Sequence, residues 1–194
     1  MAIRKIATIG HPVLREIARP LTREELRTEK VQRFIDDLVE TMRDANGAGL
    51  AATQVYEPIR ICAIEVNANP RYPYKPNIPL TILVNPVITP ILAMASETFL
   101  NYEGCLSVPN LRGEVRRQAG IRVTALDREG NELDMEVKGL TAGTFQHEVD
   151  HLDGKVFLDR VENTASLSTW GDFERFHLAA FAERARALVA RYGA

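Results

Sequence analysis

Hydrophobic residues recur along this chain at two different spacings, and each spacing predicts a different element. From residue 28 to residue 45 they recur every three or four positions, which is typical of a helix with one buried face. That face would consist of Val31, Phe34, Ile35, Leu38, Val39 and Met42. Asn46 and Gly47 then predict the end of the helix, because both residue types tolerate the backbone conformation that closes one.

Four short runs rich in isoleucine, leucine and valine predict strands at residues 59–66, 80–87, 121–126 and 133–137. The last two flank a polar turn at residues 127–131, so we predict an antiparallel hairpin there. Between the first two, residues 67–79 hold four prolines and two tyrosines, which indicates an ordered loop or an insert.

Two more helices are predicted, at residues 140–152 and 172–191. The order of elements differs from repeating strand–helix units. It predicts an α+β fold whose antiparallel strands pack around a central helix, the one at 140–152, with further helices towards both ends. At 194 residues the chain is expected to form a single domain over 1–194.

Charge and composition exclude several function classes. A net charge of −2 and a pI near 6.1 give no electrostatic reason to expect a nucleic-acid or membrane partner. The N-terminal stretch MAIRKIATIGHPVLRE lacks the apolar core of a signal peptide, and two cysteines are too few for a disulfide framework. We therefore expect a cytoplasmic protein.

The helix at 140–152 carries the sequence QHEVDH, in which His147, Glu148 and His151 form the pattern H-E-x-x-H. His147 and His151 lie about 40° apart around a helix axis, so both imidazoles can reach one metal ion. Glu148 lies about 60° from His151. It is placed to take a proton from a water molecule at the metal rather than to bind the metal itself.

The third ligand is not given by this motif. Some metalloproteases continue it to a histidine six residues after the second one, but Phe157 stands there and cannot ligate. Others use a downstream glutamate, for which Glu162 and Glu174 are the candidates, in contexts that do not favour them.

A better candidate for the third ligand is Cys105, in the segment YEGCLS. Gly104 removes bulk beside the thiol, Glu103 and Ser107 lie close by, and the segment is expected to be irregular. A thiolate and two imidazoles would fill three positions of a tetrahedral site. Cys62, inside a predicted strand, is interpreted as a small buried hydrophobic residue.

A third stretch, GAGLAATQ at 47–54, offers two glycines that allow close backbone approach and the amide of Gln54. Together the three stretches resemble the peptide deformylase family, whose motifs G-x-G-x-A-A-x-Q, E-G-C-x-S and Q-H-E-x-D-H occur here in the same order. The resemblance covers about residues 4–160. Residues 67–79 resemble the longer loop of a mitochondrial-like subgroup, but no transit peptide is recognised, so a bacterial cytoplasm is expected.

The resemblance implies removal of the formyl group from the N-terminal formyl-methionine of nascent polypeptides. Cys105, His147 and His151 would hold one divalent ion, Fe²⁺ first, with Zn²⁺, Ni²⁺ or Co²⁺ as substitutes. Glu148 would act as general base and then general acid. Gln54 and the backbone N–H of Leu106 would form the oxyanion hole.

The resemblance also implies a substrate groove, formed by Gly47, Ala48, Gly49, Tyr102, Arg112, Gly143 and Thr144. Ala48, Gly143 and Thr144 are smaller than is usual in the family, which predicts a wider or differently shaped methionine pocket. Arg112 is read either as a residue near the substrate backbone or as an ordinary surface arginine.

Two carboxylates are left with open roles. Glu103 and Asp150 would orient a metal ligand or pair with Arg116 or Arg117; a solvated salt bridge is the alternative.

Two other functions stay open at this stage. A metallopeptidase would not need Cys105 as a ligand, and a catalytically silent relative would only bind a partner. The ribosome is a further candidate partner, and both a monomer and a homodimer are compatible with the sequence. The helix at 172–191 is expected to serve core packing or a dimer contact.

Overall fold

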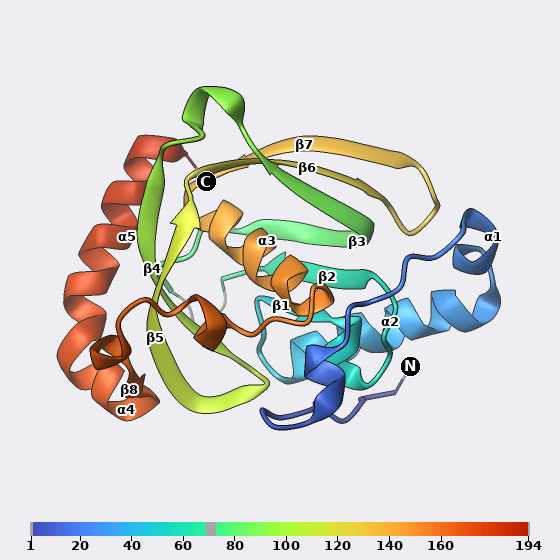
Figure 1. Ribbon diagram of the computed structural model, residues 1–194, viewed down its shortest axis with the longest axis horizontal. Helices are drawn as coiled ribbons and strands as arrows, with labels where there is room; N and C mark the ends of the chain where they lie inside the picture. The colour runs from blue at the N-terminus through green and yellow to red at the C-terminus, as the bar shows by residue number, and fades with distance from the viewer. Residues whose placement is uncertain (1, 69–72, 194) are drawn as a thin grey trace.

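The computed structural model describes residues 2–68 and 73–193 and is shown in Figure 1. Its helices are α1 (Arg23–Leu26), α2 (Glu29–Asp44), α3 (Gly139–Leu152), α4 (Trp170–Asp172) and α5 (Leu178–Tyr192). Its strands are β1 (Gly49–Ala51), β2 (Ile61–Val66), β3 (Ile78–Pro90), β4 (Thr98–Cys105), β5 (Val108–Gln118), β6 (Gly120–Leu126), β7 (Glu132–Lys138) and β8 (Ser168–Thr169). Short 3₁₀ turns and one π turn, Phe173–His177, join some of them.

One antiparallel sheet, in the order β1-β2-β3-β6-β7, separates α2 from α3. Alternate residues of β2 show this directly. Ile61 and Ala63 pack in the cluster that contains the buried face of α2, whereas Cys62 and Ile64 pack in the cluster that contains α3. A strand covered on both faces has no polar side, which explains why the first four residues of β2, 61–64, are all apolar; Glu65, near its end, pairs with Arg43.

The second sheet has the order β4-β5-β8 and is dominated by the long β4–β5 hairpin. Here the sequence prediction was wrong. Cys105 was placed in an irregular segment, but it is the last residue of β4. The strand was missed because its buried positions include Asn101 and Glu103, and these polar residues interrupt the apolar alternation that identifies strands.

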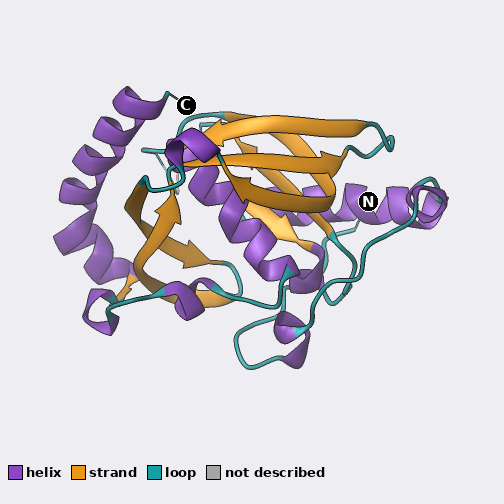
Figure 2. Cartoon of the chain, turned by 45° about the horizontal axis from the view of Figure 1, so that its top comes forward, coloured by secondary structure: helices purple, strands orange, loops and turns teal. Residues whose placement is uncertain are grey.

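Helix α3 lies between the two sheets (Figures 1 and 2). It contacts β1, β2, β3, β6 and β7 of the first sheet and β5 of the second. Thr144, Glu148, Asp150 and His151 of this helix are nevertheless buried. Buried polar groups are costly unless they are paired, so their presence on an enclosed helix indicates a site.

The other helices lie at the ends of the molecule (Figure 1). The predicted helix at 28–45 is α2, capped by Thr28 and closed at Ala45. Residues 172–191 form α4, the π turn and α5, and their Phe173 and Phe181 pack on Tyr102 of β4. This region therefore contributes to core packing, which was one of the two roles expected for the helix at 172–191.

The coarse fold prediction is confirmed: the chain forms a mixed α/β fold with antiparallel sheets and a C-terminal helix. The short helix α1 was not predicted; Thr22 and Glu25 stabilise it as a reciprocal capping pair. Within residues 2–68 and 73–193, no helix is long and apolar enough to span a bilayer.

Gly154 ends α3 and gives the first testable prediction. Its φ is +70°, and an added Cβ would lie 2.7 Å from the carbonyl oxygen of Arg15. Gly154→Ala should therefore lower the free energy of unfolding by at least about 1–2 kcal/mol. Gly171→Ala is the control, because a Cβ there has no neighbour within 4 Å. Urea denaturation measures both, and equal stabilities of the two variants would refute this account of Gly154.

Candidate active site

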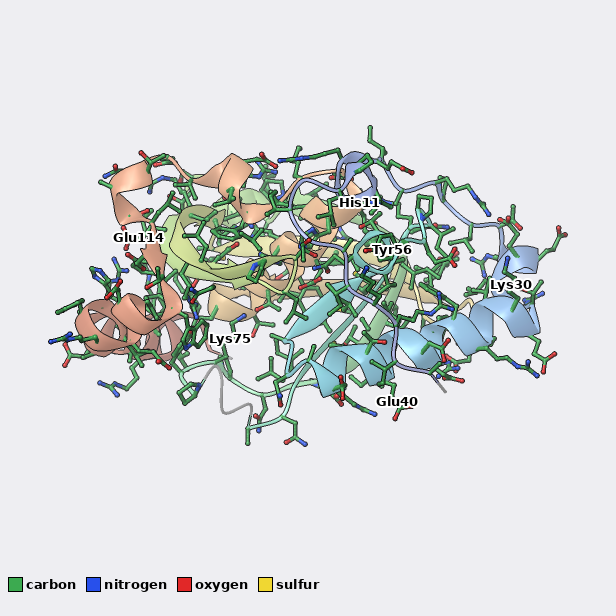
Figure 3. All side chains as sticks on the ribbon, turned by 90° about the horizontal axis from the view of Figure 1, so that it is seen from below. His11, Lys30, Glu40, Tyr56, Lys75 and Glu114 are labelled. Atoms are coloured by element: carbon green, nitrogen blue, oxygen red, sulfur yellow. The ribbon has the colours of Figure 1, made fainter. Side chains whose placement is uncertain are left out.

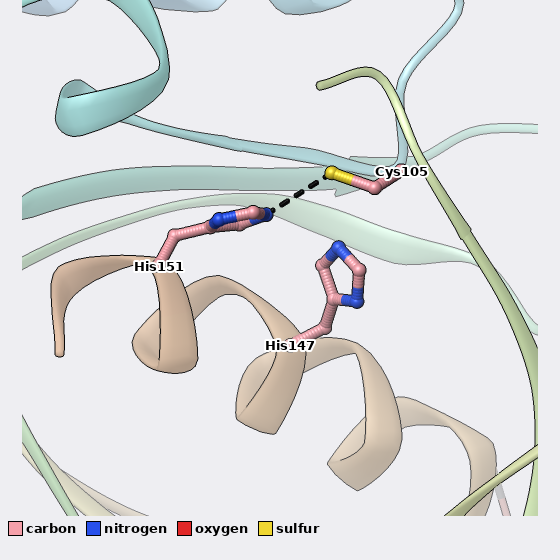
Figure 4. A group of neighbouring side chains, drawn as sticks. All are labelled: Cys105, His147 and His151. Carbon is pink, nitrogen blue, oxygen red and sulfur yellow. Dashed lines mark hydrogen bonds between the residues drawn. The ribbon is translucent and has the colours of Figure 1, made fainter. Parts of the chain in front are cut away.

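Three side chains that are far apart in sequence meet between α3 and the end of β4. His147 and His151 extend from successive turns of α3 towards Cys105 (Figure 4). One ligand atom from each residue lies within 4.8 Å of the other two, and Cys105 Sγ lies 3.2 Å from His151 Nε2. Ligand atoms around a tetrahedral ion at ordinary bond lengths are about 3.3–3.6 Å apart, so the cluster needs only a small adjustment to bind one.

The electrostatics of the cluster also fit a cation. Burial raises the pKa of the Cys105 thiol, but His151 and His147 outweigh burial and hold that pKa well below its ordinary value. Burial lowers the pKa of His147, but Cys105 and Glu103 outweigh it and raise the pKa well above its ordinary value. Metal ions and protons compete for the same ligand atoms. A divalent ion bound here would therefore replace the proton that Cys105 and Glu103 hold on His147.

Glu103 fixes the orientation of His147. Its Oε2 lies 2.9 Å from His147 Nδ1, which leaves the other ring nitrogen turned towards Cys105 (Figure 4). A carboxylate behind a ligating histidine holds the ring and its tautomer in place. The sequence analysis named this role for Glu103 as one of several.

Arg117 completes the network. Its guanidinium donates to Glu103 at 2.8 and 2.9 Å and to Asp150 at 2.6 Å, and Arg160 donates to Asp150 from the other side. Burial raises the pKa of Glu103, but Arg117 and His147 outweigh it and lower that pKa. The alternative of a solvated salt bridge is wrong for these residues, because Arg117 and Glu103 are only 3% and 5% exposed.

Glu148 lies beside the cluster and is buried. Burial raises the pKa of its carboxyl group. Its Oε2 has no hydrogen-bond partner among the residues that the structure describes. A Cβ at Gly49 would overlap this carboxylate, so the glycine of β1 provides the space that Glu148 occupies. The arrangement leaves an acceptor free to receive a proton.

Gln54 is held so that its amide group faces the cluster. Its Oε1 accepts from Ala51 N–H at 2.8 Å, and its Nε2 lies 3.4 Å from Cys105 Sγ and 3.0 Å from Ser107 Oγ. The backbone N–H of Ser107 also donates to Cys105 Sγ, at 3.3 Å. Sequence reasoning had no role for Ser107; its position two residues after Cys105 was the available signal.

A cavity of about 40 Å³ adjoins these groups. Every residue predicted for the substrate groove lines it, namely Gly47, Ala48, Gly49, Tyr102, Arg112, Gly143 and Thr144. Gln54, Glu103, Cys105, Leu106, His147 and Glu148 line it too. Three further residues that line it, Lys75, Asn101 and Gly104, were not among the predicted site residues.

Arg112 is not a surface residue, so that alternative was wrong. Its side chain is 1% exposed and its guanidinium lies over the rings of Trp170 and Phe173, 4.6 and 4.3 Å from their centroids. It donates to the carbonyl oxygen of Tyr102 at 2.9 Å and to the Tyr74 hydroxyl at 3.0 Å. The tail of the chain thus encloses one wall of the cavity.

The other candidates for a third ligand lie elsewhere. Glu162 pairs with Arg116 at the surface, and Glu174 is exposed on the π turn. Across the described part of the chain, the cluster of potential metal ligands consists of Cys105, His147 and His151.

Comparison with known proteins identifies relatives of one kind. The polypeptide deformylase family matches residues 3–166. Peptide deformylase 1 of Prochlorococcus marinus is 41% identical over 175 residues, which is 90% of this chain and 88% of the relative. The peptide deformylase of Leptospira biflexa is 41% identical over 165 residues, 84% of this chain and 90% of the relative.

Solved structures agree with these relatives. Two crystal structures of the class I type b peptide deformylase from Acinetobacter baumannii superpose with TM-scores of 0.78 and 0.77 at 37% and 38% identity. They match 84% and 82% of this chain, and 100% and 99% of their own. The second contains Met-Ala-Ser.

These relatives are bacterial, so the comparisons give no support to the mitochondrial-like subgroup. The loop that suggested it, at 67–79, lies partly outside the described residues, which omit 69–72.

The buried network predicts that replacing Arg117 lowers the free energy of unfolding much more than replacing its neighbour Arg116. Arg117→Met should lower the free energy of unfolding by about 3–5 kcal/mol, because it leaves Glu103 and Asp150 buried without their shared partner. Arg116→Met removes an exposed pair with Glu162 and should cause little change. Chemical denaturation of both variants checks this, and similar losses from both would contradict it.

Proposed function

The chain belongs to the polypeptide deformylase family, and we infer that the cluster described above performs the hydrolysis that gives the family its name. The substrate is the N-terminal formyl-methionine of a nascent polypeptide. The observation that supports this best is the buried carboxylate of Glu148, which shares one cavity with Cys105 and His147. A base, a metal site and room for a small acyl group thus occur together.

Members of this family depend on a metal, and Cys105, His147 and His151 would hold one divalent ion here. We propose Fe²⁺, following the family resemblance; thiolate and imidazole ligands also suit Zn²⁺, Ni²⁺ and Co²⁺. When bound, such an ion is a Lewis acid that makes a water molecule acidic enough to deprotonate near neutral pH. The low pKa of the Cys105 thiol favours the thiolate form that a metal requires.

Glu148 is proposed as the group that moves the proton. It takes a proton from the water that attacks the formyl carbon and returns it to the amine when the C–N bond breaks, so that formate and a free N-terminus are released. Burial raises the pKa of its carboxyl group, which suits a residue that must hold the proton between these two steps.

Gln54 and Leu106 are proposed to stabilise the charge that develops on the formyl oxygen. The Gln54 amide already faces Cys105, and Leu106 follows Cys105 in the chain. Removing one donor of this kind typically costs about 3–4 kcal/mol of transition-state stabilisation. Gly49, at the start of β1, would offer backbone hydrogen bonds to an extended peptide.

The wider setting follows from the substrate. We propose a cytoplasmic location, where nascent chains appear and where Cys105 stays reduced, and the ribosome as a second partner. The relative from Acinetobacter baumannii with bound Met-Ala-Ser supports formyl-Met-Ala-Ser as the test substrate.

Glu148→Gln tests the base. We expect formate release from formyl-Met-Ala-Ser to fall at least about 10²–10⁴-fold while the protein still binds metal, because only the proton acceptor is lost. Glu162→Gln, an exposed carboxylate outside the cavity, should leave the rate unchanged. An active Glu148→Gln variant would exclude this role. An inactive wild-type protein with full metal occupancy would exclude the proposed function.

Two cysteine variants test the third ligand. Cys105→Ala should lose both metal and activity, whereas Cys62→Ala should keep both, because Cys62 packs among apolar core residues and is not one of the clustered ligands. Elemental analysis of anaerobically purified protein measures the content and identity of the metal. Full metal occupancy in Cys105→Ala would instead show that Cys105 is not the third ligand, as the metallopeptidase alternative requires.

Glu103→Gln tests the support of His147. Removing its charge should weaken metal binding about 10- to 100-fold, as expected for a carboxylate that orients a ligating histidine. Glu114→Gln, on the paired strand β5 and bonded to Arg184, is the matched control. Competition with a chromogenic chelator for Co²⁺ gives both affinities, and equal values would show that Glu103 does not act through His147.

A further inference from the structure

The wall of the cavity next to α3 is unusually polar. Lys75 donates from Nζ to Thr144 Oγ1 at 2.9 Å, and Thr144 lies one turn before Glu148 on α3. Gly143 contributes no side chain, and a Cβ there would lie 3.3 Å from the ring of Phe99 and 3.4 Å from Nδ2 of Asn101. An ammonium, a hydroxyl and an amide therefore form the surface that the small residues of α3 leave open.

Apolar side chains are scarce around this cavity. The aliphatic ones among its lining residues are Ala48 and Leu106. Charged groups are more frequent: the cations Lys75 and Arg112 line the cavity, and so do the carboxylates Glu103 and Glu148, which both act electrostatically on Lys75. Burial lowers the pKa of Lys75 to about 8, which still leaves the amine mainly charged at neutral pH. An apolar group placed against a half-buried ammonium would displace its solvent without replacing the hydrogen bonds.

Lys75 reaches this place from the segment between β2 and β3. Figure 3 shows it on the side of the molecule where α5 lies, away from the end occupied by α2. Its partner Thr144 is 69 positions away in the sequence.

The reaction determines which part of a substrate meets this wall. The first side chain branches from the carbon atom that is bonded to the formyl nitrogen. It therefore lies within a few bonds of the formyl carbon, where the water deprotonated by Glu148 attacks. In the proposed mechanism, the formyl oxygen lies on the side of the cavity formed by Gln54 and Leu106. The side formed by Lys75, Thr144 and Asn101 remains for the first side chain.

We propose that Lys75 determines specificity and that this pocket favours N-formyl substrates whose first side chain carries a strong hydrogen-bond acceptor. The inference rests on the proposed deformylase function and refines its substrate class. Methionine itself offers only a weak sulfur acceptor, whereas oxidation to the sulfoxide adds a strongly accepting oxygen at the same position. N-terminal formyl-methionine sulfoxide is thus the substrate that fits this wall best. A side-chain carboxylate is also a strong hydrogen-bond acceptor, but it carries a negative charge.

The experiment compares kcat/KM for formyl-X-Ala-Ser, where X is norleucine, methionine, methionine sulfoxide or glutamate. Norleucine has the length of methionine without an acceptor. In the wild-type protein we expect the sulfoxide to exceed norleucine roughly 10- to 100-fold, the range expected for one hydrogen bond to a charged donor. Glutamate then shows whether a neutral acceptor suffices or an anion is preferred.

Lys75→Met keeps the length of the side chain and removes its charge. It should abolish most of the preference for the sulfoxide, measured as the ratio of kcat/KM for the sulfoxide peptide to kcat/KM for the norleucine peptide. Thr144→Val, which removes the hydroxyl that holds the ammonium, should reduce the preference in the same direction. Lys155→Met is the control, because Lys155 is an exposed lysine that does not line the cavity.

The outcomes separate this inference from the function on which it rests. Hydrolysis with the same ratio of sulfoxide to norleucine in the wild type and in Lys75→Met overturns the role of Lys75 and leaves the deformylase function intact. A wild-type preference for norleucine over the sulfoxide also overturns it. Failure to hydrolyse any of the four peptides, with metal bound, overturns the proposed function and the inference together.

Discussion

The buried guanidinium of Arg117 is the constraint on which the candidate site depends. Arg117 lies on β5, whereas its partners Glu103 and Asp150 lie on β4 and α3. One side chain therefore ties the hairpin to the helix that carries both histidines. Because all three charges are nearly excluded from water, the geometry in which they neutralise one another is strongly preferred over any in which one is unpaired. This interaction sets how β4 and α3 face each other.

The metal cluster follows from that arrangement. Glu103 is two residues before Cys105 on the same strand, and it also holds His147. Fixing Glu103 against Arg117 therefore positions the thiol and one imidazole at the same time. A buried ion network of this kind contributes little net stability compared with an apolar core, but it specifies one geometry. Ligands that must meet a small ion need that specificity more than they need stability.

Sequence patterns predicted the elements whose buried positions are occupied by apolar residues. Helix α2 has one apolar face, and β2 begins with four apolar residues because both its faces are covered there. The β4–β5 hairpin was missed because its buried face carries the polar residues of the site. The choice between Arg116 and Arg117 could not be made from sequence either. It depends on register: Arg117 pairs with Phe99, and alternation along β4 puts Phe99 on the same face as Glu103.

Local motifs identified the ligands, whereas the residues that shape the cavity required the fold. Two glycines show why. At Gly49 the absence of a side chain makes room for the Glu148 carboxylate, and at Gly143 it allows the Phe99 ring and the Asn101 amide to lie close to α3. In the sequence Gly49 suggested close backbone approach to a substrate, and Gly143 suggested a wider or differently shaped pocket. In the structure the space is taken by polar groups, because Lys75 comes from a distant loop to bond with Thr144. Polar groups therefore set the chemistry of this wall, which is why we expect its specificity to follow hydrogen bonding more than size.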